Sequence, residues 1–515
     1  MTRAPIGSGR AGSPATDAAT RAQIEAAVAR VRASGQSGWV ARVVECEAFE
    51  PLTSWQAAGV RDRFFWQRVE TGEAICAWGA VDETESAGAD RFEAVRSWSA
   101  GVRARLHFVG ADRPATAPIF VGGFGFEEAG SSSEDWKAFP AARFVLPAVL
   151  GERSGARARW VLFTRVEPTA SAQNVVAELE SRLGEALDSQ RGPESGHAAL
   201  ETAPHDGEAG SCPRTDPWPE GPEYRVRSDR AHAVFRGQVR RALDEIEAGG
   251  MEKVVLARSL CVLHDGELEV APFLARLRDL YPSCTLVAMG RGRDVFLAAT
   301  PETLVRLEGR RIETAALAGS APRGRTPEED RQLAEALLAS AKDRAEHAHV
   351  VDALREGLEP FCEALELSSA PRLRALFGIQ HLETPIRAQL HTDVRPGGRD
   401  RPAELLDLAA ALHPTPAVGG VPREAARGWL RRFEGLDRGW YAAPIGWLDG
   451  QGGGDLRVAL RSALIRNGLG PSDGSAASRA RLFGGAGIVA GSQPEQELVE
   501  TRIKLRALLA PLTEI

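Results

Sequence analysis

Lysine is scarce in this chain, since the 63 basic residues include only four lysines and the rest are arginine. A bias toward Arg, Ala and Gly accounts for most of this imbalance, but not for the positions that remain lysine. Arginine cannot lose its proton at working pH, whereas the surroundings of a lysine can lower its pKa. Each remaining lysine is therefore a candidate for proton transfer or for a compact point charge: Lys137, Lys253, Lys342 and Lys504.

Long apolar runs and paired cysteines are also absent. No stretch approaches the ~20 apolar residues of a membrane span, and the first residues lack the apolar segment of a secretory signal. The six cysteines are scattered without a CxxC pair, which favours reduced thiols over a disulfide framework or a zinc site. A net charge of −7 argues against nucleic acid or an anionic membrane surface as the main partner. We expect a cytoplasmic, monomeric protein that acts on a small molecule.

Several cofactor motifs are missing. The sequence has neither GxGxxG nor GxxxxGK followed by Ser or Thr, which excludes dinucleotide-binding Rossmann and P-loop sites. No HExxH motif is present, and His347 and His349 are too closely spaced to share one helix face as a zinc pair. We therefore expect no redox or nucleotide cofactor.

The distribution of Pro, Gly and polar residues divides the chain into four parts. These are a disordered tail at 1–17, a strand-rich N-terminal part at 18–188, a linker or surface loop at 189–227 and a catalytic region at 228–515. A polar segment at 468–478 is typical of a hairpin insertion.

Apolar periodicity predicts the elements. Asp17 is positioned to cap a helix. A helix at 91–106 interrupts a series of β-branched and aromatic runs, and a helix at 174–187 follows them. A strand is predicted at 374–389, and LRVALRSALI is interpreted as one strand that Arg461 interrupts. The strands outnumber those of one doubly wound sheet, so we predict an α/β (α+β) fold with mixed, largely antiparallel sheets covered by helices.

Two predicted helices each carry an acid pair. Asp343 and Glu346 are spaced i, i+3, and so are Glu497 and Glu500, with Lys504 one turn further on. Two such helices can build an oxygen-only site for Mg²⁺, which takes one or two carboxylates plus waters and substrate oxygens. The alternative is that these acids merely complement the helix macrodipole near the N-termini.

Three further residues suggest proton transfer or anion binding. Lys253 begins an apolar strand, where burial lowers a lysine's pKa toward base function. Glu302 lies at a turn between two apolar strands, where a raised pKa suits an acid. Arg461 faces a core and needs an anionic partner, either a protein acid or a substrate carboxylate. The alternatives are a strand-end lysine that reaches water and an exposed turn glutamate.

Small residues mark possible ligand contacts. In GGAGIVAGS a glycine-rich strand end runs into the last helix, where backbone N–H groups can face an anion; tight packing is the alternative. The turn in AALAGSAPRG allows a ligand to approach the backbone closely, or is merely a loop. His413, in LHPTPAVGG, is a candidate contact or a turn residue.

At this point the sequence resembles the chorismate-utilising enzymes, which include isochorismate, salicylate, anthranilate and aminodeoxychorismate synthases. The motifs that carry the resemblance cover residues 228–511 and occur in order: KVVLARS, ATPETLVRLEG, AALAGSAPRG, KDRAEHAHVVDALREGL, LHPTPAVGGVP and LFGGAGIVAGSQPEQELVETRIKL. The resemblance implies one large fold with two central sheets and helices outside, and an enzyme that binds Mg²⁺ and chorismate.

The resemblance also implies roles for individual residues. Glu346 and Glu500 would bind the metal, with Asp343 and Glu497 acting directly or through metal-bound water. Substrate contacts would come from a larger set: Gly319, Ser320, His413, Arg461, Gly485, Ala486, Gly487 and Lys504.

Lys253 together with Ala318 resembles the water-using branch of the family, the isochorismate synthases. The resemblance then implies that Lys253 activates water to attack C2 of chorismate while Glu302 protonates the departing C4 hydroxyl. Anthranilate synthase would need an amidotransferase partner, which Lys253 argues against. The alternatives are a salicylate synthase, which eliminates pyruvate in the same site, and a chorismate-binding subunit without turnover. The pathway is left open between menaquinone and siderophore or salicylate synthesis.

Overall fold

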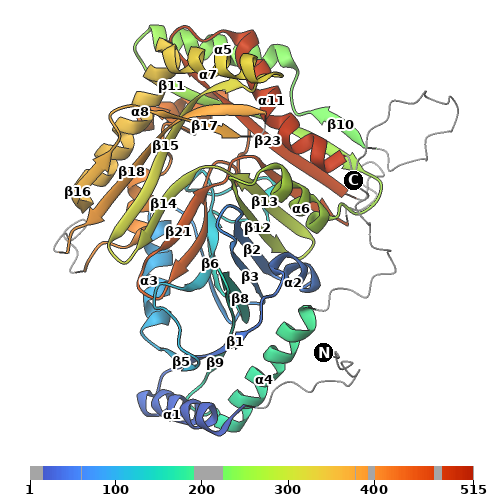
Figure 1. Cartoon of the computed structure of the whole chain (residues 1–515), viewed down its shortest axis with the longest axis vertical. Helices are drawn as coiled ribbons and strands as arrows, with labels where there is room; N and C mark the ends of the chain where they lie inside the picture. Colours follow the sequence, from blue (N-terminus) through green and yellow to red (C-terminus); the bar gives the residue numbers. More distant parts are fainter. Residues whose placement is uncertain are drawn as a thin grey trace, which may run out of the picture.

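The computed structural model describes residues 16–59, 61–190, 224–376, 378–392, 401–468 and 478–513. The predicted tail, the linker and the insertion at 468–478 lie largely outside these residues. Within them, two large sheets pack face to face and helices cover their outer sides (Figure 1). Among the described helices, none is both long and apolar enough to cross a membrane.

The first sheet has 13 strands and runs through both halves of the chain. Its strands, in spatial order, are β10 (Arg225–Ser228), β11 (Lys253–His264), β23 (Ser478–Val489), β22 (Ser462–Asn467), β13 (Asp294–Thr300), β12 (Thr285–Arg291), β2 (Arg63–Arg68), β3 (Glu73–Trp78), β8 (Val149–Ser154), β9 (Arg157–Val166), β1 (Gly38–Cys46) and β5 (Leu106–Gly110), with β19 (Gly420–Val421) beside β11.

The second sheet has 10 strands and also draws on both halves. Its order is β16 (Cys362–Leu367), β18 (Ile379–Leu390), β15 (Arg311–Pro322), β14 (Thr303–Glu308), β21 (Gly454–Val458), β20 (Pro444–Asp449), β6 (Pro118–Phe124), β7 (Ala142–Leu146) and β4 (Asp82–Ser86), with β17 (Arg372–Leu376) beside β18.

The described helices cover these sheets. They are α1 (Ala18–Ser34), α2 (Pro51–Ala57), α3 (Arg91–Arg103), α4 (Ala172–Ser189), α5 (His232–Glu247), α6 (Val270–Leu280), α7 (Pro327–Ala339), α8 (Ala341–Leu358), α9 (Leu405–Leu412), α10 (Arg423–Phe433) and α11 (Pro494–Thr513).

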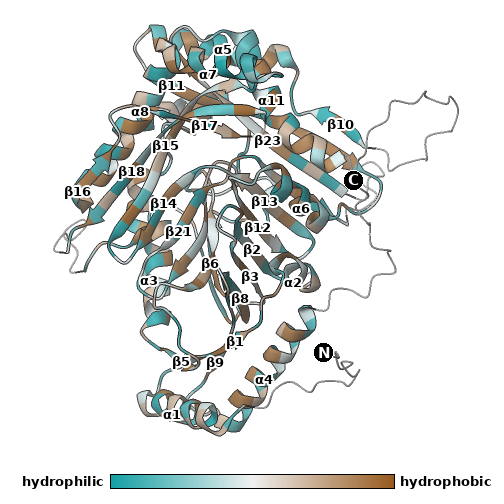
Figure 2. Ribbon diagram, viewed as in Figure 1, coloured by the Kyte–Doolittle hydropathy of each residue, from teal (hydrophilic) through white to brown (hydrophobic). Residues whose placement is uncertain are grey.

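Apolar alternation builds two hydrophobic cores. One core lies between the two sheets and is rich in aromatic residues such as Phe124, Trp136 and Phe296. The other lies on the opposite face of the first sheet, where helices such as α4 and α6 pack with Leu179 and Phe273. Hydrophobic residues follow the strands, whereas the covering helices present hydrophilic residues outward (Figure 2). Because both parts of the chain share both sheets, they form one folding unit.

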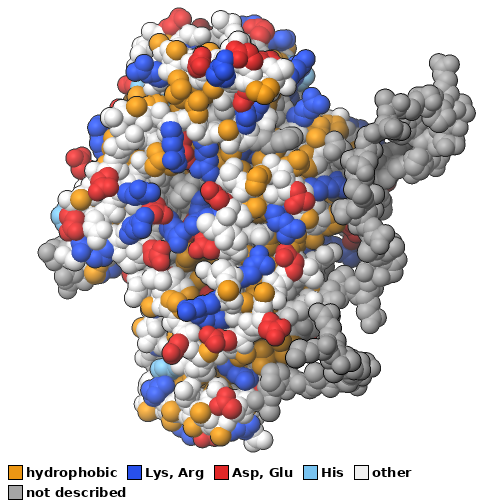
Figure 3. All heavy atoms as spheres, viewed as in Figure 1, with side chains coloured by type: hydrophobic (Ala, Val, Ile, Leu, Met, Phe, Trp, Pro, Cys, Tyr) orange, Lys and Arg blue, Asp and Glu red, His pale blue; other side chains and the backbone are white. Residues whose placement is uncertain are grey.

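The fold prediction is confirmed. Strand pairs are antiparallel throughout the described sheets except for β1 with β5, which is parallel. Asp17 caps α1, as expected, by accepting a hydrogen bond from the Thr20 backbone N–H. Basic and acidic side chains are interspersed over the face shown in Figure 3, without a large field of one sign.

Four local expectations differ from the structure. Helix α2 was not predicted, and it begins with a proline at a position where the missing N–H costs nothing. The strand predicted at 374–389 is the hairpin β17–β18, which turns at Gly378 with φ of 74°. β10 lies inside the predicted linker at 189–227. The run LRVALRSALI is not one strand, because the chain leaves the second sheet after β21 and enters the first sheet at β22.

Candidate active site

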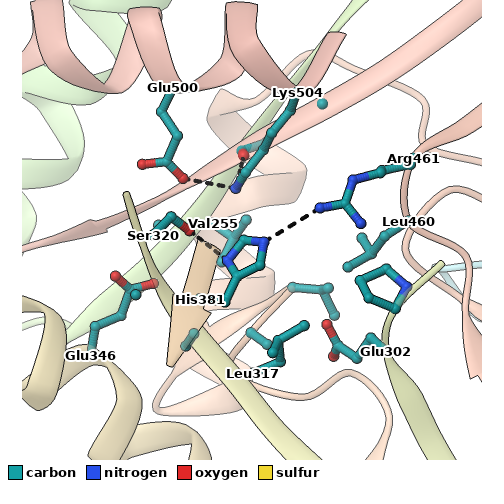
Figure 4. Close-up of a pocket in the computed structure, with 18 of the residues that line it drawn as sticks. Val255, Glu302, Leu317, Ser320, Glu346, His381, Leu460, Arg461, Glu500 and Lys504 are labelled. Carbon is teal, nitrogen blue, oxygen red and sulfur yellow. Dashed lines mark hydrogen bonds and ion pairs between the residues drawn. The ribbon is translucent and has the colours of Figure 1, made fainter. Parts of the chain in front are cut away.

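A cavity lies where β11 and β23 of the first sheet approach β15 and β18 of the second, between α8 and α11 (Figure 4). Most residues singled out in the sequence meet here, although they come from segments far apart in the chain. The predicted residues that line it are Glu302, Gly319, Ser320, Glu346, Arg461, Gly485, Gly487, Glu500 and Lys504.

Lys253 is fully buried at the first position of β11. Its Nζ lies 2.9 Å from Oε1 of Glu346, which projects from α8. A Cβ at Gly487, on the neighbouring strand β23, would collide with Glu346 Oε1, so a larger residue there would force the Glu346 carboxylate to shift. Burial raises the pKa of Glu346, but the charge and hydrogen bond of Lys253 outweigh it and leave this pKa below its ordinary value. The pair therefore places a candidate base beside an ionised carboxylate.

Glu302 occupies the turn between β13 and β14, as predicted. Its backbone is held on both sides, because its N–H donates to Thr300 Oγ1 and its carbonyl accepts from the Val458 N–H. The side chain is 5% exposed, and its carboxyl makes no hydrogen bond to any described residue. Burial raises the pKa of Glu302 to about 8, against the opposing charges of Lys253 and Lys504. The carboxyl is therefore protonated at neutral pH and can donate that proton.

Helix α11 supplies a cation and two acids. Lys504 Nζ lies 2.7 Å from Glu500 Oε1 and donates to the Gly485 carbonyl at 2.9 Å (Figure 4). Burial lowers the pKa of Lys504, but the adjacent Glu500 carboxylate outweighs it, so this pKa is raised and the lysine stays charged. Glu497 is buried and accepts a hydrogen bond from Lys342 Nζ at 3.0 Å.

The acid pairs suit a hard cation by their chemistry. Glu346 and Glu500 line the same cavity from α8 and α11. Asp343 and Glu497 lie one turn before them, and Asp343 accepts a hydrogen bond from Ser340. Among the described residues no group of three or more His, Cys, Asp or Glu side chains is gathered as a closed metal cage. Two carboxylates in an open cavity match the donor set of Mg²⁺, which completes its shell with waters and substrate oxygens.

Arg461 presents a cation without an acidic partner. It lies between β21 and β22 with φ of 45°, a backbone conformation that non-glycine residues rarely adopt. The side chain is buried, and its guanidinium contacts only neutral groups, namely His381 Nε2 at 3.4 Å, Cys284 Sγ at 3.8 Å and the Tyr281 ring. No carboxylate in the described part of the chain pairs with it. A buried guanidinium of this kind is suited to a carboxylate ligand.

One predicted contact, His413, lies apart from the other site residues. His413 does not line the cavity, because it is buried in the aromatic core with Nε2 3.3 Å from the Phe126 carbonyl oxygen. Burial and the nearby charge of Arg91 lower the pKa of His413 to about 3. GGAGIVAGS is the end of a strand that leads to the last helix, as expected, because Gly485 pairs with Ala257 inside the sheet, β23 ends at Val489 and α11 begins at Pro494.

The remaining predicted residues lie beside the cavity. Ala486 is fully buried between two cavity glycines, and its methyl points to the other face of the strand. Three of the four lysines meet at the site, whereas Lys137 is an exposed residue 3.7 Å from Glu134.

Several residues of the cavity wall were not predicted from the sequence. His381 lies on β18 and hydrogen-bonds to Ser320, and Tyr441 stacks on Phe483 at 5.1 Å between ring centres. The sequence signal for His381 was a polar residue at an inward position of an apolar strand. The other wall residues that were missed are Val255, Pro301, Leu317, Ala417, Val418 and Leu460.

Comparisons with known proteins agree with this geometry. A family model described as "Chorismate binding enzyme" matches residues 23–513. The salicylate biosynthesis isochorismate synthase of Pseudomonas aeruginosa is 37% identical over 502 residues, covering 96% of this chain and 95% of that protein. The isochorismate synthase MenF of Bacillus subtilis is 30% identical over 479 residues, covering 91% and 92%.

Solved structures share the fold. The menaquinone-specific isochorismate synthase MenF from Escherichia coli superposes with a TM-score of 0.70 at 23% identity, over 95% of this chain and 100% of that one. Anthranilate synthase component I from Streptococcus pneumoniae gives 0.63 at 22% identity, over 85% and 92%.

Proposed function

The chain belongs to the family of chorismate-binding enzymes, and we propose that it is an isochorismate synthase, which isomerises chorismate to isochorismate. The near-complete coverage of relatives named as isochorismate synthases supports this activity. The observation that carries it is a pair of buried groups of opposite character: Lys253, which contacts the cavity residue Glu346, and Glu302, a carboxyl in the cavity wall that is kept protonated.

We propose that these two groups move the protons of the reaction. Lys253 acts as the base in its neutral form, after it has released its own proton, and takes a proton from a water molecule whose oxygen forms a bond to C2 of chorismate. Electrons shift through the ring, the bond from C4 to its hydroxyl breaks, and Glu302 gives its proton to that hydroxyl, which leaves as water. One water is gained and one is lost, so substrate and product have the same mass. A base and an acid of separated pKa are what such a step requires.

Positive charge in the cavity would hold the substrate, which carries two carboxylates. Arg461, which is buried, and Lys504, which is half-buried, both line the cavity, and Arg461 has no acidic partner among the described residues. The backbone turn at Gly319, with φ of 76°, lets the chain approach a ligand closely. Ser320, Gly485 and Gly487 complete the proposed contacts.

The carboxylates fit Mg²⁺ as the cofactor. Glu346 and Glu500 would hold the ion, with Asp343 and Glu497 acting directly or through water. When bound, the ion would neutralise a substrate carboxylate and polarise the ring. No nucleic acid, membrane or amidotransferase partner is required by this chemistry, and we propose a cytoplasmic monomer. The relatives carry names from both menaquinone and salicylate synthesis, and either pathway would use the same product.

Product analysis tests the proposal. Purified protein is incubated with chorismate and Mg²⁺, and the products are separated by chromatography and weighed by mass spectrometry, with EDTA as the control. We expect a new compound of unchanged mass that approaches equilibrium with chorismate and does not form with EDTA. Formation of salicylate and pyruvate would assign the salicylate synthase activity instead. Absence of turnover, with ammonia supplied as well, would leave only a chorismate-binding subunit.

A further inference from the structure

Arg461 is held in an unusual way for a buried cation. Its guanidinium donates to a ring nitrogen of His381 (Figure 4). It also contacts the Cys284 thiol and the Tyr281 ring, and none of these groups is charged. A carboxylate in their place would hold the arginine more tightly, but it would also cancel the charge that a substrate carboxylate needs. The contact with His381 is the one hydrogen bond of this set to a strong acceptor.

The hydrogen bonds fix the protonation of His381. Arginine can only donate, so His381 Nε2 must accept the hydrogen bond from Arg461 Nη2. In a neutral imidazole the proton then sits on Nδ1, which donates to Ser320 Oγ at 2.9 Å. Ser320 therefore holds the ring in the orientation and tautomer in which Nε2 faces the arginine.

The surroundings keep His381 uncharged. The side chain is 7% exposed on β18, and burial together with the charges of Arg461 and Lys504 holds its pKa well below the ordinary value. A hydrogen bond with the Gly319 backbone acts in the opposite direction but does not outweigh these effects, and Arg374 also lowers this pKa. A protonated imidazole would donate from both nitrogens and repel the guanidinium. His381 is thus held as a neutral acceptor.

We propose that His381, locked by Ser320, is a positioning residue that aims Arg461 at a substrate carboxylate without neutralising its charge. This inference rests on the proposed function in one respect, since it takes the ligand of Arg461 to be a carboxylate of chorismate. It gives Ser320 a supporting role in addition to its proposed substrate contact, because a hydroxyl that accepts from Nδ1 can still donate its own proton.

Three substitutions of His381 distinguish the effect of its hydrogen-bond acceptor from the effects of side-chain shape and charge. His381→Gln retains an acceptor, His381→Leu removes it, and His381→Glu supplies an acceptor that pairs with Arg461 and cancels its charge. The readouts are kcat and KM for chorismate, and the affinity for benzene-1,3-dicarboxylate, a ring dicarboxylate that cannot react, measured by calorimetry. The calorimetric measurement of this affinity does not depend on whether the enzyme turns over chorismate.

We predict how the three variants rank in their effects on KM and on the calorimetric Kd. The Gln variant should change KM and the calorimetric Kd by less than about threefold, and the Leu variant should raise both by about tenfold or more, the loss typical of one hydrogen bond to a charged group. The Glu variant should raise both more than the Leu variant does. In all three kcat should change less than KM, because an interaction with the bound substrate carboxylate acts on binding.

His413→Leu is the matched control, since His413 is equally buried and neutral but lies away from the cavity. It should leave KM and Kd unchanged. The inference is overturned if His381→Leu binds the dicarboxylate as the wild type does, or if His381→Glu binds it better than His381→Gln does. If the wild type turns over no chorismate but the dicarboxylate results keep their order, the proposed function fails and the positioning role stands. If the Leu variant does not fold, the comparison of the Gln and Glu variants decides.

Discussion

Replacing the Glu302 carboxyl by an amide is the perturbation with the most closely determined outcome. The carboxyl is buried, and its pKa of about 8 means that about nine in ten molecules hold the proton at pH 7. Glu302→Gln keeps the size and the neutral charge of the side chain but removes the acidic proton. We expect kcat to fall by about a hundredfold to ten-thousandfold, the usual contribution of a positioned general acid. In the wild type, kcat should decline above pH 8 as the carboxyl ionises.

The same shift predicts a change in stability. Between the ordinary pKa of 4.5 and about 8, the folded protein keeps a proton on Glu302 that the unfolded chain has released. Stability therefore falls as the pH rises through this window, and the full cost at pH 8 and above is about 5 kcal/mol. The amide of the Glu302→Gln variant cannot ionise, so the variant should match the wild type near pH 4.5 and exceed it in stability near pH 8.

Urea unfolding of both proteins at about pH 5, 6, 7 and 8 measures this difference, because other titrating groups contribute equally to both and cancel. Steady-state kinetics over the same pH range supply the activity. The reasoning would be refuted by a constant stability difference across the range, or by a Gln variant with wild-type kcat.

Three further predictions concern the base, the metal and the glycine strand. Lys253→Met should lower kcat by about a hundredfold or more, and a kcat close to that of the wild type would remove this lysine from the proton transfer. Glu500→Gln should weaken Mg²⁺ binding in calorimetry at least about tenfold; unchanged affinity would place the ion elsewhere. Gly487→Ala should lower kcat/KM by about a hundredfold because its Cβ would collide with Glu346 Oε1. Gly428→Ala, which meets open space on α10, is the control that should retain activity, and equal loss in both would contradict the steric argument.

Local features of the site were accessible from the sequence. Patterns of a few residues predict Lys253 at the start of a strand and Glu302 at a turn between apolar strands. The structure places both residues at these positions. The acid pairs on α8 and α11 follow from helical spacing in the same way. The sequence alone does not show that Lys253 meets Glu346, because that contact depends on the pairing of β11 with β23 and on the packing of α8 across them.

The errors arise where tertiary packing decides. His413 and His381 are both histidines among apolar residues, and only the assembled sheets show that His381 faces the cavity while His413 faces Phe126. The run that contains Arg461 is apolar on both sides, so its pattern is that of one strand. The change of sheet at this residue, with its left-handed backbone, has no local signal in the sequence.

The most direct test of the central claim is the fate of solvent oxygen. Chorismate is incubated with the enzyme and Mg²⁺ in water enriched in oxygen-18, and the isochorismate formed is analysed by mass spectrometry. If water activated by Lys253 attacks C2 and the C4 hydroxyl leaves, isochorismate should carry one heavy oxygen atom, located at C2. Isochorismate with no heavy oxygen would mean that the hydroxyl group migrates within the substrate, and the proposed roles of Lys253 and Glu302 would be wrong.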